Sequence, residues 1–311
     1  MSSVWKALFP YAANCYPGAR IMISFAEVVS QLLNGLVLGL LYALIALGFM
    51  LILGVMGVIN FSHGILFAWG AYFAFTLRPI IGFWPALLIS PILVGIMGLI
   101  LEFAVRRSYG KDPLFGLLLT FGAAMALEEI IRMIWGSIGY TFAAPSFAAG
   151  PIHLGFMPYS KYRLFLAGLS VLLIILVWLF LEKTPYGAII KAGAFDSEMV
   201  MALGIDLRRL RTFVFGLGAA LAGVAGVIAA PLWSIKPTMG VDAIMPAFVV
   251  VVIGGVGSFW GSVLGGLIVG IGTSISVMFM PRTSGIIMYV LMAIIILIRP
   301  RGIMGEKSIL E

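Results

Sequence analysis

Three polar side chains, Asn60, Ser62 and His63, stand in an otherwise apolar stretch, GVMGVINFSHG at residues 54–64. Buried polar groups cost free energy unless they are paired, so this cluster predicts part of a pathway or gate for a polar solute. The three residues could instead only cap the ends of a broken helix. A lone histidine is more often structural than a proton carrier, and we assign no pH-dependent chemistry to His63.

A charged group, formed by Glu128, Glu129 and Arg132, lies within one predicted helical turn. Glu128 and Arg132 are four residues apart, the spacing at which opposite charges meet on one helix face. Burial of one partner alone would be costly, which favours a structural salt bridge. The ammonium and carboxylate of an amino acid could also be bound by such a pair, and the sequence leaves that alternative open.

Motifs for other kinds of chemistry do not occur in the sequence. No GxxxxGK[ST] phosphate-binding loop is present, so the chain cannot hydrolyse ATP on its own. No zincin motif, nucleophile elbow or carboxylate-plus-histidine constellation is present either, which argues against an enzyme. Cys15 is the single cysteine, which excludes an internal disulfide and a Cys/His metal cluster. We expect no metal and no cofactor.

The composition is that of a membrane protein. Apolar residues make up 62% of the chain and charged residues 10%, whereas about a quarter of the residues of a soluble globular protein are charged. The apolar segments reach the roughly 20 residues that a transmembrane helix needs, and short alternating segments of the barrel type do not occur. The sequence predicts an all-α, polytopic transmembrane bundle in contact with lipid. The net charge of +7 requires no nucleic-acid partner.

The apolar segments predict about nine membrane crossings with two broken helices. The expected spans are Phe25 to Leu53, a second ending near Leu77, Phe83 to Val105, Pro113 to Trp135, Tyr162 to Leu181, Thr212 to Ala230, Ala243 to Ile253, Gly261 to Met280 and Gly285 to Ile298. Residues 1–24 are expected to be a leader without a cleavable signal, 25–305 the transmembrane domain, and 306–311 a C-terminal tail.

Basic residues predict the orientation of the chain. They cluster at residues 106–111, 183–211 and 299–307, and the positive-inside rule places these regions in the cytoplasm. Counting back from them puts the N-terminus on the outer side and the C-terminus in the cytoplasm.

A second glycine-rich interruption, GGVGSFWG, covers residues 254–261. Gly254, Gly255 and Gly257 offer no side-chain chemistry, so only close packing or a gating backbone can be argued for them. Broken backbone at membrane depth is tolerated where it is buried in protein or lines a watery cavity. The two breaks, each before a helix rich in small residues, suggest a weak internal duplication with a transport site between halves. We therefore count these glycines among the candidate pathway residues.

The longest polar segment between two spans, Glu182 to Arg211, is expected to contain a short helix that stands off the membrane. Thr184 followed by Pro185 predicts its start, and Gly204 predicts its end. Between them Phe195, Met199 and Ala202/Leu203 recur with helical spacing and form one apolar stripe. The stripe is exposed to cytosol unless a partner protein covers it. An amphipathic helix lying on the membrane surface is the alternative.

The spacing in this segment resembles the cytoplasmic coupling loop of LivH-type permease subunits of bacterial branched-chain amino acid ABC importers. The matching residues are Lys191, Ala192, Ala194, Asp196, Met199, Leu203, Gly204 and Ile205. Two positions depart from the family, which usually has an arginine in place of Lys191 and often a polar residue in place of Phe195. Further stretches that look like the same family are 54–64, 213–227, 236–240, 247–270 and 299–305.

The resemblance implies an ABC importer permease fold in the bacterial inner membrane. It implies four kinds of subunit: this permease, a second homologous permease forming a heterodimer with it, two ATP-binding cassette ATPases that receive the coupling loop, and a periplasmic substrate-binding protein. The substrate expected from it is a small polar solute, foremost a branched-chain or related amino acid. Similar permeases also serve amides, urea and aromatic acids, and the sequence does not choose among them.

One rival interpretation is a stand-alone secondary transporter, driven by an ion gradient through Glu128 or His63. That interpretation leaves the apolar stripe on residues 186–204 without a purpose. Co-purification distinguishes the two, because an importer permease should retain soluble ATPases and a secondary transporter should not.

Overall fold

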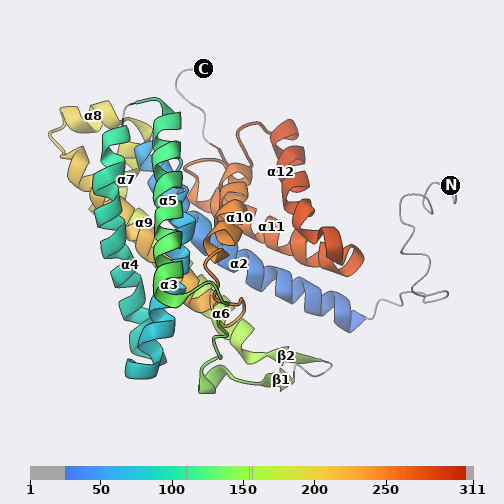
Figure 1. Ribbon diagram of the computed structural model, residues 1–311. Coiled ribbons are helices and arrows are strands. Elements are labelled where there is room, and N and C mark those ends of the chain that lie inside the picture. Colours follow the sequence, from blue (N-terminus) through green and yellow to red (C-terminus); the bar gives the residue numbers. More distant parts are fainter. Residues whose placement is uncertain (1–24, 110, 154, 156, 306–311) are drawn as a thin grey trace, which may run out of the picture.

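The computed structural model describes residues 25–305 except 110, 154 and 156. The expected leader, 1–24, and the expected tail, 306–311, lie outside the described residues. Within the described part the regular structure is almost entirely helical, with one two-stranded antiparallel sheet (Figure 1). The prediction of an all-α transmembrane bundle is confirmed.

The helices follow one another along the chain with short connections. The elements are α2 (Phe25–Met56), α3 (Ser62–Ile81), α4 (Phe83–Val105), η1 (Arg106–Ser108), α5 (Pro113–Trp135), η2 (Ser146–Ala148), β1 (Pro151–His153), β2 (Pro158–Ser160), α6 (Lys161–Lys183), α7 (Pro185–Phe195), α8 (Ser197–Ala202), α9 (Leu207–Ala229), α10 (Met239–Gly254), α11 (Phe259–Phe279), η3 (Pro281–Ile286) and α12 (Ile287–Ile298). The fold is thus a series of long apolar helices interrupted by two short ones, α7 and α8.

Eight helices of the described chain are long and apolar enough to cross a membrane, where about nine crossings were expected. A further apolar helix, α10, has 16 residues, fewer than the roughly 20 that a perpendicular crossing requires. The expected spans 83–105 and 113–135 coincide with α4 and α5, whereas the first span continues to Met56. The chain is a multi-pass helical membrane protein.

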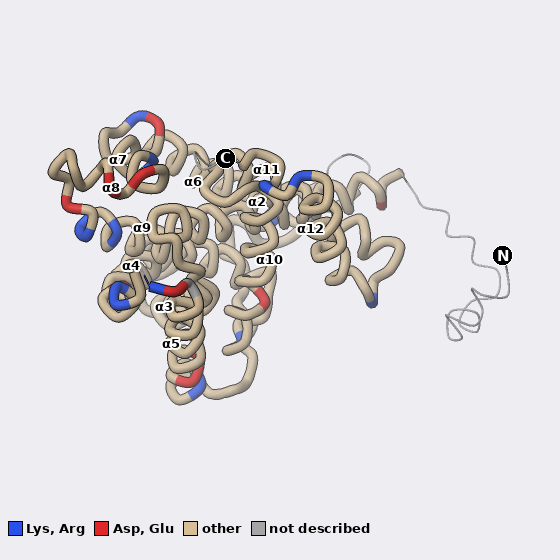
Figure 2. The backbone as a smooth tube through the Cα atoms, turned by 90° about the horizontal axis from the view of Figure 1, so that it is seen from above, with Lys and Arg blue, Asp and Glu red and all other residues tan. Residues whose placement is uncertain are grey.

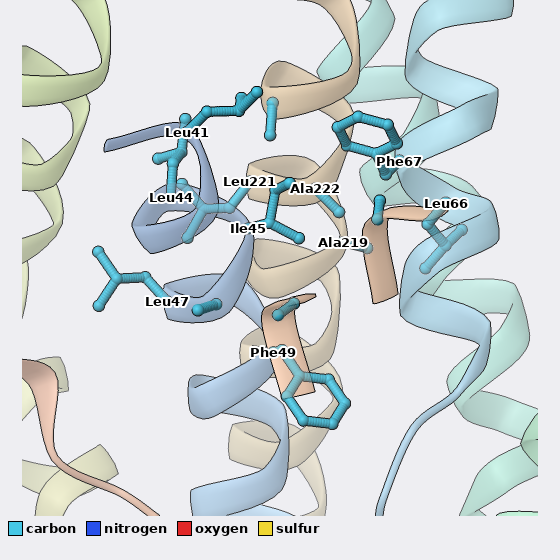
Figure 3. Packing of buried hydrophobic residues seen from close by; sticks show 14 of the residues in the cluster. Leu41, Leu44, Ile45, Leu47, Phe49, Leu66, Phe67, Ala219, Leu221 and Ala222 are labelled. Atoms are coloured by element: carbon cyan, nitrogen blue, oxygen red, sulfur yellow. The ribbon is translucent and has the colours of Figure 1, made fainter. Parts of the chain in front are cut away.

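The longest helix, α2, lies at the centre of the molecule. From Gly35 onward most of its residues are buried, and the side chains of Leu41, Leu44 and Leu47 are wholly enclosed. Figure 3 shows how α2 packs beside α9 and α3. The residues labelled there are Leu41, Leu44, Ile45, Leu47 and Phe49 of α2, Leu66 and Phe67 of α3, and Ala219, Leu221 and Ala222 of α9.

Glycines bring the backbones of α2 and its neighbours into direct contact. A Cβ added to Gly270 of α11 would lie 2.3 Å from Cα of Gly39, and one added to Gly48 would lie 2.7 Å from the carbonyl oxygen of Gly218 on α9. Small residues of this kind allow close helix packing in lipid, where no hydrophobic force draws helices together. The position of α2 is therefore fixed by backbone contact with α9 and α11.

The two ends of the bundle carry different structures. The short helices α7 and α8 lie at one end, which we call the coupling end, and the β1–β2 hairpin lies at the opposite, hairpin end (Figure 1). Figure 2 shows charged residues gathered around α7 and α8, while the long helices carry few. At the hairpin end, Tyr140 and Ile235 exchange two backbone hydrogen bonds of 2.8 and 2.9 Å and so tie two loops together.

Candidate functional site

The coupling segment begins where the sequence predicts. Thr184 accepts a hydrogen bond from the Gly187 backbone N–H at 3.1 Å, and Pro185 is the first residue of α7. A Cβ on Gly187 would lie 2.3 Å from the carbonyl oxygen of Leu181, so the first turn of α7 packs tightly against the end of α6. The hydroxyl cap and the preset proline φ together start the helix.

The expected single helix from 184 to 204 is wrong, because the chain breaks at Asp196. The backbone of Asp196 is extended, and its carboxylate accepts hydrogen bonds from the N–H groups of Glu198 at 3.0 Å and Met199 at 2.9 Å. Aspartate competes for local backbone donors in this way, which ends α7 and starts α8. Asp196 is thus the N-cap of α8.

The predicted end of the segment at Gly204 is confirmed. Gly204 has φ of +78°, and its N–H donates to the carbonyl of Met201, while the N–H of Ile205 donates to the carbonyl of Val200. This pair of bonds is the Schellman arrangement that glycine permits after a helix. The half-buried Ile205 then leads the chain back toward α9.

The apolar stripe stays exposed although its helix is broken. Phe195 is 61% exposed, Met199 59% and Leu203 73%, and Ala202 is exposed as well. Buried side chains on the opposite face, Ile190 and Val200, attach α7 and α8 to the rest of the protein. The apolar stripe therefore lies on the outer surface of the protein, on the side that faces away from the bundle.

The other residues of the coupling motif have distinct positions. Ala192 and Ala194 are exposed on α7, and between them the buried Gly193 faces Leu207 and Leu210 of α9. Lys191 forms an ion pair with Glu182 at the end of α6. The motif thus combines an outward face with contacts that hold α7 against α6 and α9.

The predicted break after α2 is formed by residues 57–61, and its polar side chains are fully buried. The Asn60 side-chain oxygen accepts hydrogen bonds from the backbone N–H of Ser62, at 3.1 Å, and from the Ser62 hydroxyl. The imidazole Nε2 of His63 lies 3.1 Å from the carbonyl oxygen of Ile45 and donates to it. Asn60 therefore binds the first backbone N–H of α3, whereas Phe61, the N-cap residue itself, has no side-chain capping bond.

Capping does not use all the polar atoms of this break. Among the described residues, Asn60 Nδ2 and His63 Nδ1 have no hydrogen-bond partner although both are buried. A buried polar atom without a partner costs roughly 1–3 kcal/mol, so such atoms are uncommon in a region with only a structural role. The interpretation of Asn60, Ser62 and His63 as pathway residues stays a prediction.

Thr120 of α5 is a part of this region that the sequence analysis missed. Its hydroxyl accepts a hydrogen bond of 3.2 Å from the N–H of Phe61 and lies 3.1 Å from the carbonyl oxygen of Ile59. The side chain is fully buried. A signal was present, because Thr120 is the one polar side chain between the start of α5 and Glu128.

The charged group on α5 forms the expected ion pair, at a distance from the break. Arg132 Nη2 lies 2.5 Å from Glu128 Oε1, and Arg132 Nε lies 3.8 Å from the more exposed Glu129. Glu128 follows Thr120 by eight residues, which is about 12 Å along a helix. The structure therefore does not bring this pair together with Asn60, and the substrate-binding role of Glu128 and Arg132 stays a prediction.

The second break is held by the C-terminal part of the described chain. The N–H groups of Ile303 and Met304 donate to the carbonyls of Ile253 and Gly254 at 2.8 and 2.9 Å. A Cβ on Gly255, where φ is +100°, would lie 2.5 Å from the backbone nitrogen of Gly305. These contacts give the glycines a packing role.

The two breaks meet, but not through their polar residues. A Cβ on Gly54, at the end of α2, would lie 3.7 Å from Cα of Gly257, which has φ of +83°. A pathway role for Gly254, Gly255 and Gly257 stays a prediction.

A buried polar network at the coupling end was also missed. Glu102 of α4 has no exposed surface and receives hydrogen bonds from Arg106, Tyr109 and Thr212. Burial, and then the charge of Glu102, raises the pKa of Tyr109, so its hydroxyl stays protonated and able to donate. The same hydroxyl lies 3.1 Å from Sδ of Met56, the last residue of α2. The network thus joins α2, α4 and α9.

Comparison with known proteins gives a family and a fold. The family model described as branched-chain amino acid transport system, permease component, matches residues 31–296. The high-affinity branched-chain amino acid transport system permease protein BraD of Pseudomonas aeruginosa is 30% identical over 90% of this chain and 97% of its own length. LivH of Escherichia coli K12 is 28% identical over 92% and 98% of the two chains.

Similarity extends to an archaeal relative and to a solved structure. A probable branched-chain amino acid transport permease protein LivH of Methanocaldococcus jannaschii is 29% identical over 93% of each chain. A chain of PsaBC from Streptococcus pneumoniae, solved in complex with Fab, aligns with a TM-score of 0.50 over 88% of this chain and 95% of that chain. At 14% identity this likeness concerns the fold alone. The family match and the two bacterial relatives confirm the resemblance on which the coupling motif was assigned, and the chain belongs to the permease-component family of branched-chain amino acid transport systems.

Proposed function

We propose that this chain is a membrane-spanning permease subunit of an ABC importer that moves a branched-chain or closely related amino acid across the inner membrane. The observation that carries the proposal is the exposed stripe of Phe195, Met199 and Leu203. These side chains lie on or directly after two N-capped helices, α7 and α8, at one end of the helical bundle. Large apolar side chains concentrated on a protruding element mark a protein interaction site. The partner that fits it is an ATP-binding cassette ATPase, since this chain has no nucleotide-binding loop of its own.

The proposed assembly contains two ATPases, a periplasmic substrate-binding protein and a second, homologous permease. Helix α12 has no buried residue and exposes half of its apolar side chains, which supports a neighbouring chain or lipid on that side. The binding protein would deliver substrate at the hairpin end. Asn60, Ser62 and His63 would then lie on the route, since all three are buried polar residues and Asn60 and His63 each place an unpaired polar atom inside the bundle.

The proposed orientation has the coupling end in the cytoplasm. Basic residues on both sides of α7 and α8, among them Lys183, Arg208 and Arg209, support it through the positive-inside rule. The N-terminus is then periplasmic and the C-terminus cytoplasmic. Accessibility labelling of single cysteines placed at Ser146 and at Ser197 in a Cys15→Ser background tests this, because only the first should react with an impermeant reagent in intact cells.

The decisive experiment replaces Phe195 and Met199 together by aspartate. Each lost apolar anchor can weaken association by about 2 kcal/mol, and the new carboxylates would need to be desolvated in the ATPase groove. We expect the ATPases to dissociate, with uptake and substrate-stimulated ATP hydrolysis lost together. The level of inserted protein should stay normal, because both side chains are already exposed.

The matched control replaces the same two residues by leucine, which keeps the stripe apolar. This variant should retain the ATPases and transport. Uptake that persists in the aspartate variant without bound ATPase would instead favour a secondary transporter. Substrate identity is tested separately, by calorimetric screening of amino acids, amides, urea and aromatic acids against the partner binding protein.

A further inference from the structure

A cavity of about 470 Å³ opens at the hairpin end, and no residue discussed so far as a pathway candidate lines it. Its lining residues are Tyr42, Trp233, Ser234, Lys236, Met239 and Asp242. The volume lies within the range of about 300–1,000 Å³ that is usual for small-molecule sites. Glu128 and Arg132, the charged pair that the sequence suggested for an amino acid, do not line it.

The walls of the cavity are fixed by the fold. Tyr42 comes from the buried middle of α2, and Met239 is the first residue of α10. Trp233 lies in the connection between α9 and α10, and its ring contacts the Tyr42 ring with centroids 6.5 Å apart. The next turn is anchored by the two backbone hydrogen bonds between Ile235 and Tyr140. The aromatic side of the cavity is therefore preorganised rather than formed by a loose loop.

The polar side of the cavity carries one charge of each sign. Lys236 Nζ lies 2.7 Å from Asp242 Oδ2, and the two side chains are 47% and 53% exposed. An exposed ion pair adds little to stability, so a ligand that offers both partners a new counter-charge can replace the pair without a large loss. A free α-amino acid is such a ligand, because its Cα carries both a carboxylate and an ammonium group.

We propose that this cavity is a low-affinity receiving site for a zwitterionic α-amino acid, an inference that rests on the proposed function. Lys236 binds the substrate carboxylate and Asp242 binds the ammonium. The apolar substrate side chain lies against Tyr42, Trp233 and Met239. The combination of a mostly apolar wall with a few oriented polar groups is what gives small-molecule sites their selectivity.

The floor of the cavity connects to the broken segment after α2. Gly240 directly follows Met239, and a Cβ added to Gly64 would lie 2.3 Å from the Gly240 carbonyl oxygen. Gly64 in turn follows His63. The start of α10 and the polar break are thus in backbone contact, so a ligand that shifts Met239 also acts on the segment that carries Asn60 and His63.

The test measures ligand binding to the assembled transporter in detergent without binding protein, by saturation-transfer NMR. The probes are L-leucine, 4-methylpentanoate, which lacks the amino group, and 3-methylbutylamine, which lacks the carboxylate. We expect Asp242→Asn to weaken leucine and the amine at least tenfold but to spare the acid. Lys236→Met should weaken leucine and the acid at least tenfold but spare the amine.

A charge-swapped variant, Lys236→Asp with Asp242→Lys, separates binding from a structural role. It restores the ion pair but reverses the two charges relative to the fixed aromatic wall, so leucine binding should stay weak. Recovery of wild-type binding in the swap, or unchanged leucine binding in both single variants, would overturn the proposal.

Uptake into proteoliposomes with binding protein distinguishes a wrong cavity assignment from a wrong importer proposal. If the wild-type transporter imports leucine and both single variants match it at every leucine concentration, the cavity assignment is wrong and the importer proposal stands. If the wild type imports no member of an amino acid panel, the proposed function itself is wrong.

Discussion

The Thr212 hydroxyl donates a hydrogen bond of 3.0 Å to the carboxylate of Glu102, a residue 110 positions earlier in the chain. Glu102 is buried near the end of α4, and Thr212 lies in the second turn of α9, just after the coupling segment. Arg106 contacts both residues. The end of α4 and the start of α9, which directly follows the coupling segment, are therefore joined by side-chain hydrogen bonds.

We predict that Glu102→Gln lowers the amount of inserted protein several-fold and lowers its melting temperature in detergent, whereas Thr212→Val has a small effect. The first change leaves the Arg106 guanidinium beside a buried neutral amide, and removal of one member of a buried charge pair is the costly case. The second change leaves the ion pair in place. Quantitative immunoblotting and fluorescence melting check this, and equal damage by the two variants would show that Glu102 is not the centre of the network.

We predict opposite results for two alanine substitutions of helix glycines. Gly270→Ala should strongly reduce stability, because its Cβ would lie 2.3 Å from backbone atoms of Gly39. Gly122→Ala on α5 meets no atom within 4 Å and should be neutral or stabilise the helix by up to about 1 kcal/mol. Melting curves of the purified variants compare them, and a tolerated Gly270→Ala would mean that α2 and α11 are farther apart than described.

Gly204 allows a test of the coupling segment that involves only the backbone. No atom lies within 4 Å of an added Cβ, so Gly204→Val acts through its φ of +78° alone. A β-branched residue is strained there, by more than about 1–2 kcal/mol, whereas asparagine tolerates this conformation. We expect ATPase co-purification to fall with valine and to be nearly retained with asparagine. If both variants bind the ATPase fully, the end of α8 does not position the stripe.

The two carboxylates of α5, Glu128 and Glu129, lie at different distances from the Arg132 guanidinium. Glu128→Gln removes the negative charge from the 2.5 Å contact with Arg132, whereas Glu129→Gln removes it from a contact of 3.8 Å made by a largely exposed side chain. We predict that the first variant reduces inserted protein and uptake together, and that the second stays close to wild type. A selective loss of uptake by Glu128→Gln at normal protein level would instead support a direct role in substrate binding.

The sequence predicted those features that depend on local pattern. The ends of α4 and α5, the cap at Thr184 and the left-handed Gly204 all follow from hydropathy and from residues that start or stop helices. The break at Asp196 was missed although its signal was local, because the apolar spacing across it was given more weight than the N-capping preference of aspartate.

Other features could not be predicted from one sequence, because they join distant segments. Nothing near Glu102 indicates that its partner is Thr212, and nothing in the turn after α9 indicates that Tyr42 lines the same cavity as Lys236. Such pairs are set by how the helices cross, which depends on all their contacts together. The glycine-rich break that the sequence predicts at 254–261 lies at 255–258, and its contact with residues 303–305 has the same non-local origin.

The central position of α2 has a consequence for biosynthesis. Its backbone contacts are with Gly218 of α9 and with Gly266 and Gly270 of α11, so the first of them is translated about 160 residues after α2 ends. At a rate of roughly 5–20 residues per second, the ribosome needs on the order of 10–30 s to reach α9. Until then the glycine face of α2 lacks its partners on α9 and α11. The close backbone packing that encloses α2 can therefore form only after most of the chain has been synthesised.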